Sequence, residues 1–143
     1  MKILIVGGGT VGYYLARTLM EHGHEPVIIE SNRAVRAGLA NSLDIPIIRG
    51  DGTSVEALQE AGADTADALI AVSGRDEINL IACQLARSEF HLRRAVAKAN
   101  NPKNADVMRT LGVDIAVSSV DVIARMLEQE VDMSRIKRLV SLN

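Results

Sequence analysis

The chain has 143 residues, a formal net charge of −2, 48% hydrophobic residues and 2% aromatic residues. This length suits one domain with its own core. With so few aromatic residues the core must be built from Ile, Val, Leu and Ala, as in a parallel sheet covered by helices. No run of like charge favours nucleic acid as a partner. The single cysteine, Cys83, excludes an internal disulfide, so we expect a protein of the reducing cytoplasm.

Short apolar segments alternate with longer amphipathic segments, which is the pattern of repeated strand–helix units. The predicted strands are residues 2–6, 26–30, 46–49, 68–72, 94–99 and 113–117. The predicted helices are residues 11–22, 33–42, 54–61, 77–88, 102–111 and 120–131. We therefore predict an α/β fold, a Rossmann-type doubly wound six-stranded parallel sheet in a single domain with a C-terminal helix. The domain spans residues 1–132, and residues 133–143 form a tail or the start of a further segment.

Capping residues mark several of the predicted helix starts. Thr53 and Glu56 have the spacing of a capping box. Asn101 precedes a proline, as an N-cap precedes a first-turn proline. Asp76 stands at the start of the fourth predicted helix, where capping is the favoured role.

A glycine-rich loop joins the first predicted strand to the first predicted helix. Its residues are Gly7, Gly8, Gly9, Thr10, Val11 and Gly12. This is the G-x-G-x-x-G pattern of dinucleotide-binding loops, in the strand–turn–helix setting that the pattern requires. Gly7 allows the tight turn, Gly9 lets a pyrophosphate approach the backbone, and Gly12 lets helix and strand pack closely. The phosphates then meet free N–H groups at the positive end of the helix dipole.

An acidic residue, Glu30, ends the second predicted strand at about the 20-residue spacing expected for a ribose-binding acid. Its carboxylate can accept two hydrogen bonds from the adenosine ribose and repels a 2′-phosphate, which favours NAD over NADP. Ser31 and Arg33 follow as further candidates on this side. Arg33 and Arg36 weaken the preference, because a guanidinium can accommodate the extra phosphate. The alternative is that the glycines only form a turn and Glu30 is a solvated strand end.

Ligands of open α/β sheets bind beyond the carboxyl ends of the strands, so the residues there are the next candidates. They are Asp51, Thr53, Val72, Ser73, Gly74 and Lys98. Asp51 and Thr53 suit the adenine side, but turn formation and helix capping explain them equally well. Ser73 and Gly74 suit the central ribose, and Lys98 can offset phosphate charge.

No catalytic or metal-binding constellation stands out. The three histidines are scattered, without a nucleophile or carboxylate at a diagnostic spacing, and are interpreted as surface residues. Cys83 lies among apolar neighbours and is interpreted as a core thiol rather than a nucleophile. We therefore expect neither a metal site nor catalytic residues.

Further motifs follow the glycine loop and Glu30. They are Gly50-Asp51-Gly52-Thr53, Ala61-Gly62-Ala63-Asp64-Thr65-Ala66-Asp67 and the pair Asp76 and Asn79. In this order the motifs resemble the N-terminal nucleotide-binding (RCK or KTN) domain of Trk-type potassium-uptake regulatory proteins. The resemblance covers nearly the whole chain.

The resemblance implies roles for individual residues. Gly7, Gly9, Gly12 and Glu30 would hold a dinucleotide, Asp51 and Thr53 its adenine side, and Ser73 its central part. NAD(H) is the implied ligand. Relatives tuned to ATP and ADP often carry Arg where this chain has Thr10, so ATP and ADP are less favoured.

The resemblance also implies partners. These are a potassium-translocating membrane subunit, met at the inner face of the cell membrane, and further copies of the chain in a dimer or larger ring. The expected function is therefore regulatory, with dinucleotide binding controlling ion flux. The chain stops where a C-terminal ligand-binding domain usually follows in the family, so it is expected to be a small subunit or a fragment.

The alternative function is a small NAD(P)-dependent oxidoreductase or its cofactor-binding fragment. Hydride transfer needs a substrate pocket and usually a proton donor, yet the Rossmann elements use the sequence to about Val117 and leave one helix and a tail. A redox-sensing DNA-binding protein would need a basic reading element, which is absent. We therefore expect no enzymatic activity.

The last predicted helix carries an apolar stripe of Val120, Ile123, Ala124, Leu127 and Val131. The stripe either packs on the chain's own sheet or meets a second copy. In the resembling family the corresponding helix crosses to a neighbouring subunit, so we expect a symmetric dimer that shares this helix. The tail adds the apolar residues Ile136, Leu139 and Val140.

Overall fold

Six parallel strands form the centre of the protein. The structure is a computed structural model that describes the backbone of residues 1–141. It describes their side chains as well, apart from those of residues 134, 136, 137 and 139–141. The strands are β1 (Lys2–Val6), β2 (Glu25–Glu30), β3 (Ile47–Arg49), β4 (Ala68–Ala71), β5 (Arg94–Lys98) and β6 (Ile115–Val117). The helices are α1 (Thr10–Glu21), α2 (Arg33–Ser42), α3 (Val55–Glu60), α4 (Asp76–Ser88), α5 (Asn104–Thr110) and α6 (Ser119–Ser141), with a 3-10 turn η1 (Ala63–Thr65). The predicted Rossmann-type fold is confirmed.

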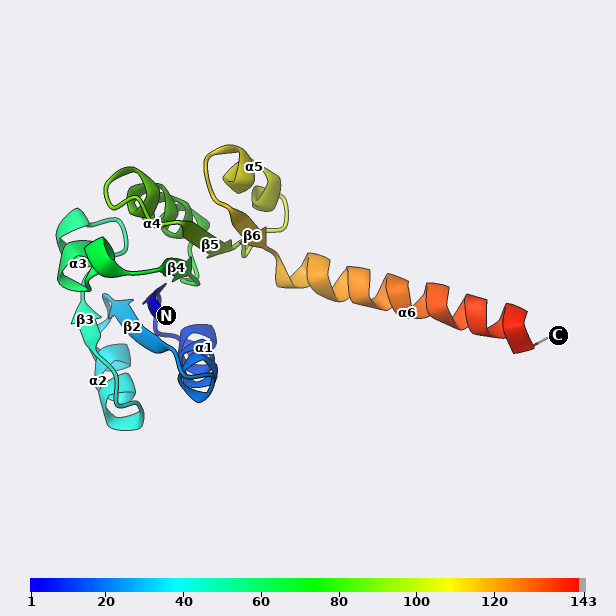
Figure 1. Cartoon of the computed structure of the whole chain (residues 1–143), viewed down its shortest axis with the longest axis horizontal. Helices are drawn as coiled ribbons and strands as arrows, with labels where there is room; N and C mark the ends of the chain where they lie inside the picture. Colours follow the sequence, from blue (N-terminus) through cyan, green and yellow to red (C-terminus); the bar gives the residue numbers. More distant parts are fainter. Residues whose placement is uncertain (142–143) are drawn as a thin grey trace.

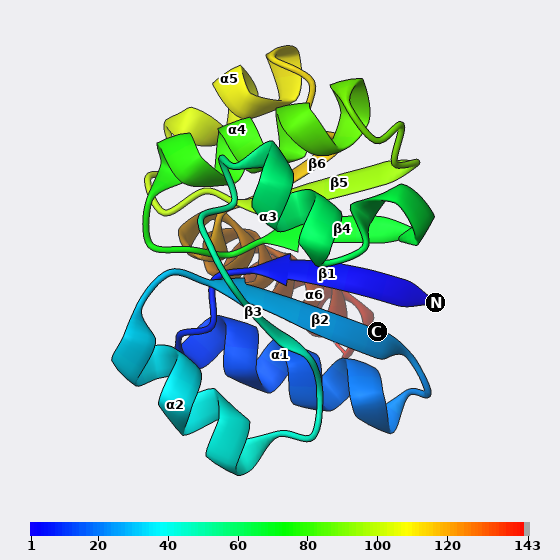
Figure 2. The ribbon, with the colours of Figure 1, turned by 90° about the vertical axis from the view of Figure 1, so that its left-hand side faces the viewer.

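Two layers of helices enclose most of the sheet. Helices α1 and α2 lie on one face, and α3, α4 and α5 lie on the other (Figures 1 and 2). Successive residues of β1 serve both layers, because side chains alternate across a strand. Ile5 packs with α1 and α2, whereas Leu4 and Val6 pack in the larger core on the opposite face. Burial on both faces explains the continuous apolar strands.

The strand order β3-β2-β1-β4-β5-β6 reverses direction between β1 and β4. The chain winds outward from β1 to β3, crosses the sheet, and winds outward again from β4 to β6. At such a reversal the loops after the two central strands lead to opposite faces and leave a crevice at the carboxyl ends. The fold therefore places the crevice between the ends of β1 and β4.

One half of the sheet is open on the α1 side. In the register, Ile5 lies opposite Ile70, Ile70 opposite Val96, and Val96 opposite Ile115, so these four side chains share one face. Ile5 is fully buried beneath α1 and α2, whereas Ile115 is 49% exposed. Val117, on the same face, is 39% exposed. We call the apolar surface of Ile70, Val96, Ile115 and Val117 the open half-face.

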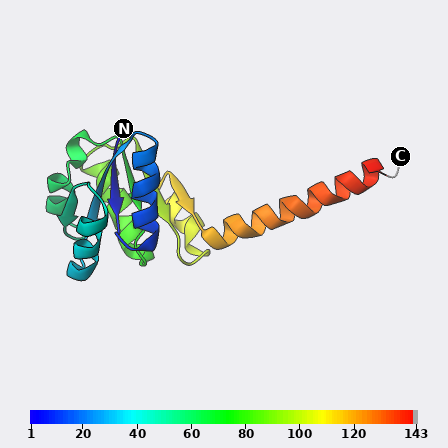
Figure 3. The ribbon, with the colours of Figure 1, turned by 90° about the horizontal axis from the view of Figure 1, so that it is seen from below.

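Helix α6 projects away from the body (Figures 1 and 3). Its apolar stripe is exposed, with Ile123 at 66% and Leu127 at 65%. The alternative that the stripe packs on the chain's own sheet is therefore wrong. The helix also continues past the predicted end at residue 131 to Ser141. The side chains of the predicted apolar tail residues Ile136, Leu139 and Val140 lie outside the described residues.

The structure differs from the prediction at the starts of two helices, α3 and α5. Ser54 rather than Thr53 caps α3, because the Thr53 N–H donates to the Asp51 carboxylate at 2.9 Å and holds Thr53 in the preceding turn. Asn101 is not an N-cap. Helix α5 begins at Asn104, and Asn101 closes a turn before it by accepting a backbone N–H.

Cys83 lies in the core between α4 and the sheet, and its Sγ is 3.6 Å from the carbonyl oxygen of Val96. Burial raises the pKa of the thiol to about 12, and the negative charge of Asp114 adds to the effect. A thiol with this pKa stays protonated and unreactive at neutral pH. The prediction of a core thiol is confirmed.

Candidate functional site

The glycine loop between β1 and α1 depends on two close approaches. Gly7 has a φ of +103°, and a Cβ built there would lie 2.9 Å from the backbone of Ser73. A Cβ at Gly12 would overlap the carbonyl oxygen of Gly7. Any side chain at either position would force the loop apart, so glycine is needed for the chain to turn tightly here.

Gly9 plays a different part, because a Cβ there would meet no atom within 4 Å. It is the N-cap of α1, and no side chain caps this helix. The first N–H groups of a helix have no partners within the helix, and they carry the positive end of its dipole. The N-terminus of α1 therefore offers open donors toward the space in front of Gly9.

That space is a cavity of about 440 Å³ at the carboxyl ends of the central strands. The predicted site residues that line it are Gly7, Gly9, Thr10, Val11, Glu30, Ser31, Val72, Ser73, Gly74 and Lys98. A smaller recess of about 50 Å³ beside it is lined by Asp51, together with Gly7, Glu30 and Ser73. The fold thus brings eleven candidates from five strand ends to one place.

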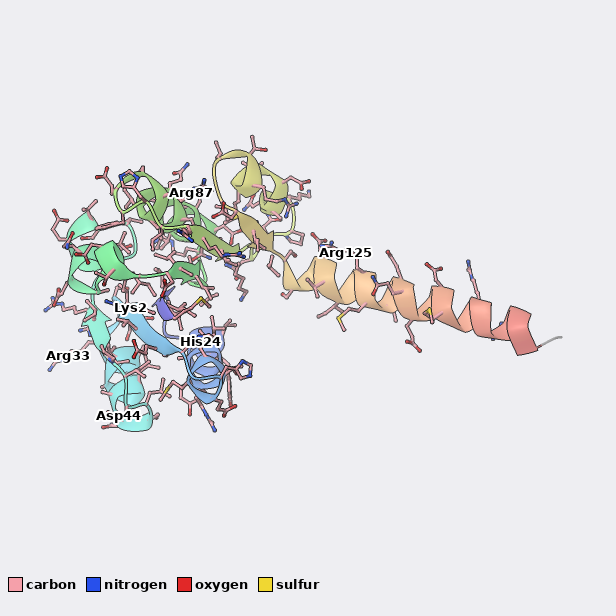
Figure 4. All side chains as sticks on the ribbon, viewed as in Figure 1. Lys2, His24, Arg33, Asp44, Arg87 and Arg125 are labelled. Carbon is pink, nitrogen blue, oxygen red and sulfur yellow. The ribbon has the colours of Figure 1, made fainter. Side chains whose placement is uncertain are left out.

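Four predicted site residues do not line these spaces. Gly8 is buried and donates its N–H to the Glu30 carboxylate. Gly12 packs against Gly7, as described above. Thr53 belongs to the turn before α3. Arg33 is not among the lining residues, and its side chain extends outward from α2 (Figure 4).

The cavity has two lining residues that the sequence analysis missed. Arg75 follows β4 beside Ser73 and Gly74, so the strand-end rule that selected its neighbours would have found it. Ile78 lies in the first turn of α4, and only the packing of that helix brings it to the cavity.

Backbone groups hold the Glu30 carboxylate in place. Its two oxygens accept the N–H groups of Gly8, at 2.7 Å, and Asn32, at 2.8 Å. The guanidinium of Arg36 donates to the carbonyl oxygens of Glu30, at 3.2 Å, and Ser31, at 2.7 Å. A carboxylate has about four acceptor sites, so Glu30 keeps capacity for a ligand. Arg36, by contrast, is engaged by the backbone of the loop.

Asn79 joins the ends of β4 and β5. Its side chain is fully buried, and its amide group donates to the carbonyl oxygens of Ser73, at 3.0 Å, and Lys98, at 2.9 Å. Its oxygen accepts the N–H of Ser73 at 3.0 Å and the hydroxyl of Ser73 at 2.6 Å. Asn79 therefore fixes two cavity-lining residues without lining the cavity itself.

Asp76 does not cap α4, contrary to the prediction. Its carboxylate accepts hydrogen bonds from the backbone N–H groups of Asn100 and Asn101 and from the side-chain amides of Asn100 and Asn104. Burial by itself raises the pKa of the Asp76 carboxyl, but these hydrogen bonds outweigh burial and hold the pKa below its ordinary value. Asp76 thus ties the loop after β4 to the loop that leads into α5.

A larger hollow of about 660 Å³ lies at the opposite, amino ends of β1–β3. Lys2, His24 and Asp44, which Figure 4 labels, come to it from three separate segments. In this fold class ligands bind at the carboxyl ends of the strands. The smaller cavity, where the glycine loop and the helix N-terminus converge, is therefore the candidate functional site.

The sheet order, the glycine loop and the crevice where the order reverses define a Rossmann-type domain. More specifically, the chain belongs to the TrkA-N domain family, which matches residues 3–119. The match ends as α6 begins.

None of the helices within residues 1–141 has the length and apolar content needed to cross a membrane.

Among curated proteins, the chain is similar to the "Trk system potassium uptake protein TrkA homolog" of Methanothermobacter thermautotrophicus. The two are 34% identical over 142 residues, which is 99% of this chain and 65% of that protein. The chain thus spans somewhat less than two thirds of the relative's length.

Among solved structures, the chain is similar to the RCK domain of GsuK, with a TM-score of 0.77 and 27% identity over 94% of this chain and 28% of that one. GsuK bound to ADP has a TM-score of 0.75 and 28% identity, covering 89% of this chain and 32% of that one. The GsuK channel bound to NAD shares the fold, with a TM-score of 0.72 and 23% identity over 81% of this chain and 21% of that one.

We predict that Asp76→Asn destabilises the protein in a pH-dependent way. The folded-state pKa of Asp76 is lowered, so the ionised carboxylate stabilises the folded protein. This stabilisation is fully present at pH values above the ordinary pKa of 3.8 and is lost as pH falls through the folded-state pKa. The expected loss at neutral pH is about 1–3 kcal/mol, typical of hydrogen bonds to a charged group. Urea unfolding of both proteins at several pH values measures it.

Glu77→Gln is the matched control for this experiment, because it removes an exposed carboxylate from the next position. It should change the unfolding free energy far less at neutral pH. A difference between wild type and Asp76→Asn that stays constant down to pH 2 would contradict the role given to the carboxylate.

Proposed function

We propose that this chain is a regulatory domain that binds an adenine dinucleotide, NAD(H) in preference to ATP or ADP. Binding changes its conformation and thereby controls ion flux through a potassium-translocating membrane subunit at the cytoplasmic face. The observation that carries the proposal is the order of groups along the cavity: a carboxylate at β2, open N–H donors at β1, and a cation at β5.

This order matches the parts of a dinucleotide. Glu30 suits the hydroxyls of the adenosine ribose, and the open N-terminus of α1 beside Gly9 suits the pyrophosphate. The second nucleoside would then extend over the ends of β4 and β5, beside Val72 and Lys98. The cavity of about 440 Å³ is within the size range of small-molecule sites.

Regulation is favoured over hydride transfer by the relatives. The similar protein of Methanothermobacter is a potassium uptake protein by name, and the similar GsuK structures hold NAD or ADP in a channel protein. A small oxidoreductase remains the alternative, but no observation in the described residues favours it. Thr10 supports NAD(H) over ATP, because relatives tuned to ATP often carry Arg there.

The surroundings of Glu30 support NAD over NADP. A 2′-phosphate would lie against the carboxylate, and neither nearby arginine is placed to neutralise it. Arg36 is bound to backbone carbonyl groups, and Arg33 extends outward from α2 and does not line the cavity (Figure 4). The backbone contacts of Arg36 therefore support the proposed preference for NAD over NADP.

Two exposed apolar surfaces support a dimer. The open half-face lacks a helix cover, and α6 carries an unpaired apolar stripe. Contiguous exposed apolar surface is typical of interaction sites. In a two-fold dimer, α6 of each copy would cover the open half-face of the other, so each copy would supply what the other lacks.

We predict that Gly9→Val abolishes NADH binding without unfolding the protein. The valine side chain would enter open space inside the cavity and block the pyrophosphate from the helix N-terminus. Gly38→Val is the matched control, because a Cβ at Gly38 on α2 also meets open space but lies outside the cavity. Thermal shift with NADH measures binding. If Gly9→Val binds NADH as tightly as wild type, the site is elsewhere.

We predict that the protein binds NADH more than about fivefold more tightly than NADPH, since juxtaposed like charges cost at least about 1 kcal/mol. Glu30→Gln should narrow this ratio, because it removes the repulsion while keeping the side-chain shape. Arg33→Ala, the control, should leave the ratio unchanged. Calorimetric titration gives each affinity. Equal affinities of wild type for the two cofactors would refute the role of Glu30.

We predict that Ile123→Glu with Leu127→Glu dissociates the dimer, because two charges would enter the buried stripe. Sedimentation of the purified chain measures the mass. Arg125→Glu, on the polar face of α6, makes the same change in net charge and should leave the dimer intact. A folded double variant that remains dimeric would exclude α6 as the interface.

A further inference from the structure

The larger hollow lies at the amino ends of β1–β3, at the opposite end of the sheet from the glycine loop. Its volume of about 660 Å³ is within the size range of small-molecule sites. Apolar side chains form much of its lining. They are Met20, Pro26, Val27, Ile45, Pro46, Ile48 and Ala61. A ligand that fills the hollow therefore needs an apolar part.

Three exposed carboxylates also line the hollow, those of Glu25, Asp44 and Glu60. None of them forms a hydrogen bond or ion pair with any residue in the described part of the chain. Lys2 is the one lysine or arginine among the described lining residues, and its ammonium donates to the Thr65 hydroxyl at 3.2 Å. The amino group of Met1 lies outside the lining and donates to Nδ1 of His24 at 3.2 Å. The lining therefore carries a net negative charge.

Three helices end at this hollow, because the helices that connect parallel strands run back toward the amino ends of the strands. Met20 is in the last turn of α1, Asp44 follows the end of α2, and Glu60 is the last residue of α3. The C-terminus of a helix carries the negative end of its dipole. None of these three helices has a basic residue in its last turn. The helix ends therefore add to the negative potential of the carboxylates.

Helices α4 and α5, in the other half of the molecule, have such a basic residue. Arg87, in the last turn of α4 (Figure 4), donates to the carbonyl oxygen of Gly112 at 3.1 Å. Arg109, in the last turn of α5, donates to the carbonyl oxygen of Ala116 at 2.9 Å. In that half the protein supplies its own cations at the helix ends. The hollow at β1–β3 instead suits a cation that comes from a ligand.

The carboxylates of the hollow are spread out rather than convergent. Within the residues that the structure describes, no group of three acidic, histidine or cysteine side chains is arranged to hold a metal ion. Glu25, Asp44 and Glu60 stand on separate segments around the apolar lining. A matching ligand therefore needs several separate cationic groups joined by apolar carbon. Aliphatic polyamines, in which methylene segments join ammonium groups, have this structure.

We propose that the hollow at the amino ends of β1–β3 is a second ligand site, which binds an aliphatic polyamine. The ammonium groups pair with the three carboxylates, and the methylene segments lie on the apolar lining. The electrostatics are the reverse of those in the nucleotide cavity, where the N-terminus of α1 suits a pyrophosphate. Because the two sites lie at opposite ends of β1 and β2, both ligands can be bound at once.

Calorimetric titration of the intact chain with spermidine tests the proposal. Asp44→Asn with Glu60→Gln should weaken spermidine binding on the order of fivefold, the effect expected of two solvent-exposed ion pairs. Met20→Lys, a second variant, places an ammonium in the hollow and should weaken binding as well. Glu21→Gln with Asp64→Asn is the matched control. It makes the same change in net charge at exposed carboxylates outside the hollow and should keep the wild-type affinity.

The apolar lining is tested with diamines of different length. The compound α,ω-diaminooctane should bind at least about tenfold more tightly than α,ω-diaminobutane, because each buried methylene group stabilises the complex. Magnesium chloride, whose cation is doubly charged but has no apolar part, should bind more weakly than spermidine.

Four results would overturn the proposal. They are no spermidine binding to wild type at millimolar concentration, equal weakening by the lining pair and the control pair, equal affinities of the two diamines, and magnesium binding as tight as that of spermidine. The second would show an effect of net charge alone, and the last two a site for bare charge. Thermal shift with NADH should be the same for all these variants, so the outcome is independent of the proposed dinucleotide function.

Discussion

The close approach of three backbone segments at the glycine loop is the constraint on which the rest of the site depends. Gly12 touches the carbonyl of Gly7, and Gly7 touches the backbone of Ser73. These contacts bring the loop after β1 against the loop after β4, at the point where the strand order reverses. A single side chain at Gly7 or Gly12 would separate these segments.

A second set of polar contacts extends this arrangement across the sheet. Asn79 holds Ser73 and the backbone of Lys98, and Asp76 holds the loop that leads into α5. Buried polar networks that are fully satisfied resist distortion, because breaking one bond leaves an unpaired group. The wall of the cavity is therefore rigidly connected to β5 and α5. These contacts reach β5 and the start of α5, and α6 begins two residues after β6 ends.

The open half-face lies next to the cavity. Lys98 and Val96 are two residues apart on β5, so both point to the same side of the sheet, and Lys98 also lines the cavity. A helix docked on the open half-face would lie close to the β5 end of the cavity.

Local features were determined by the sequence alone. The strand–glycine–helix order, the spacing to Glu30 and the apolar character of the strands each depend on near neighbours in the chain. They were sufficient to predict the fold and most of the cavity lining. Gly9 and Thr10 could be placed in the cavity because the motif itself contains the turn that exposes them.

Other features were decided only by tertiary structure. Asp76 resembles a cap in sequence, but its partners lie on the loop before α5. Arg36 resembles a phosphate ligand, but the loop after β2 folds back and uses its guanidinium. The stripe of α6 fits a helix packed on its own sheet, yet α6 leaves the body. In each case the outcome depends on which distant segments meet, and hydrophobic periodicity and residue type carry no information about that choice.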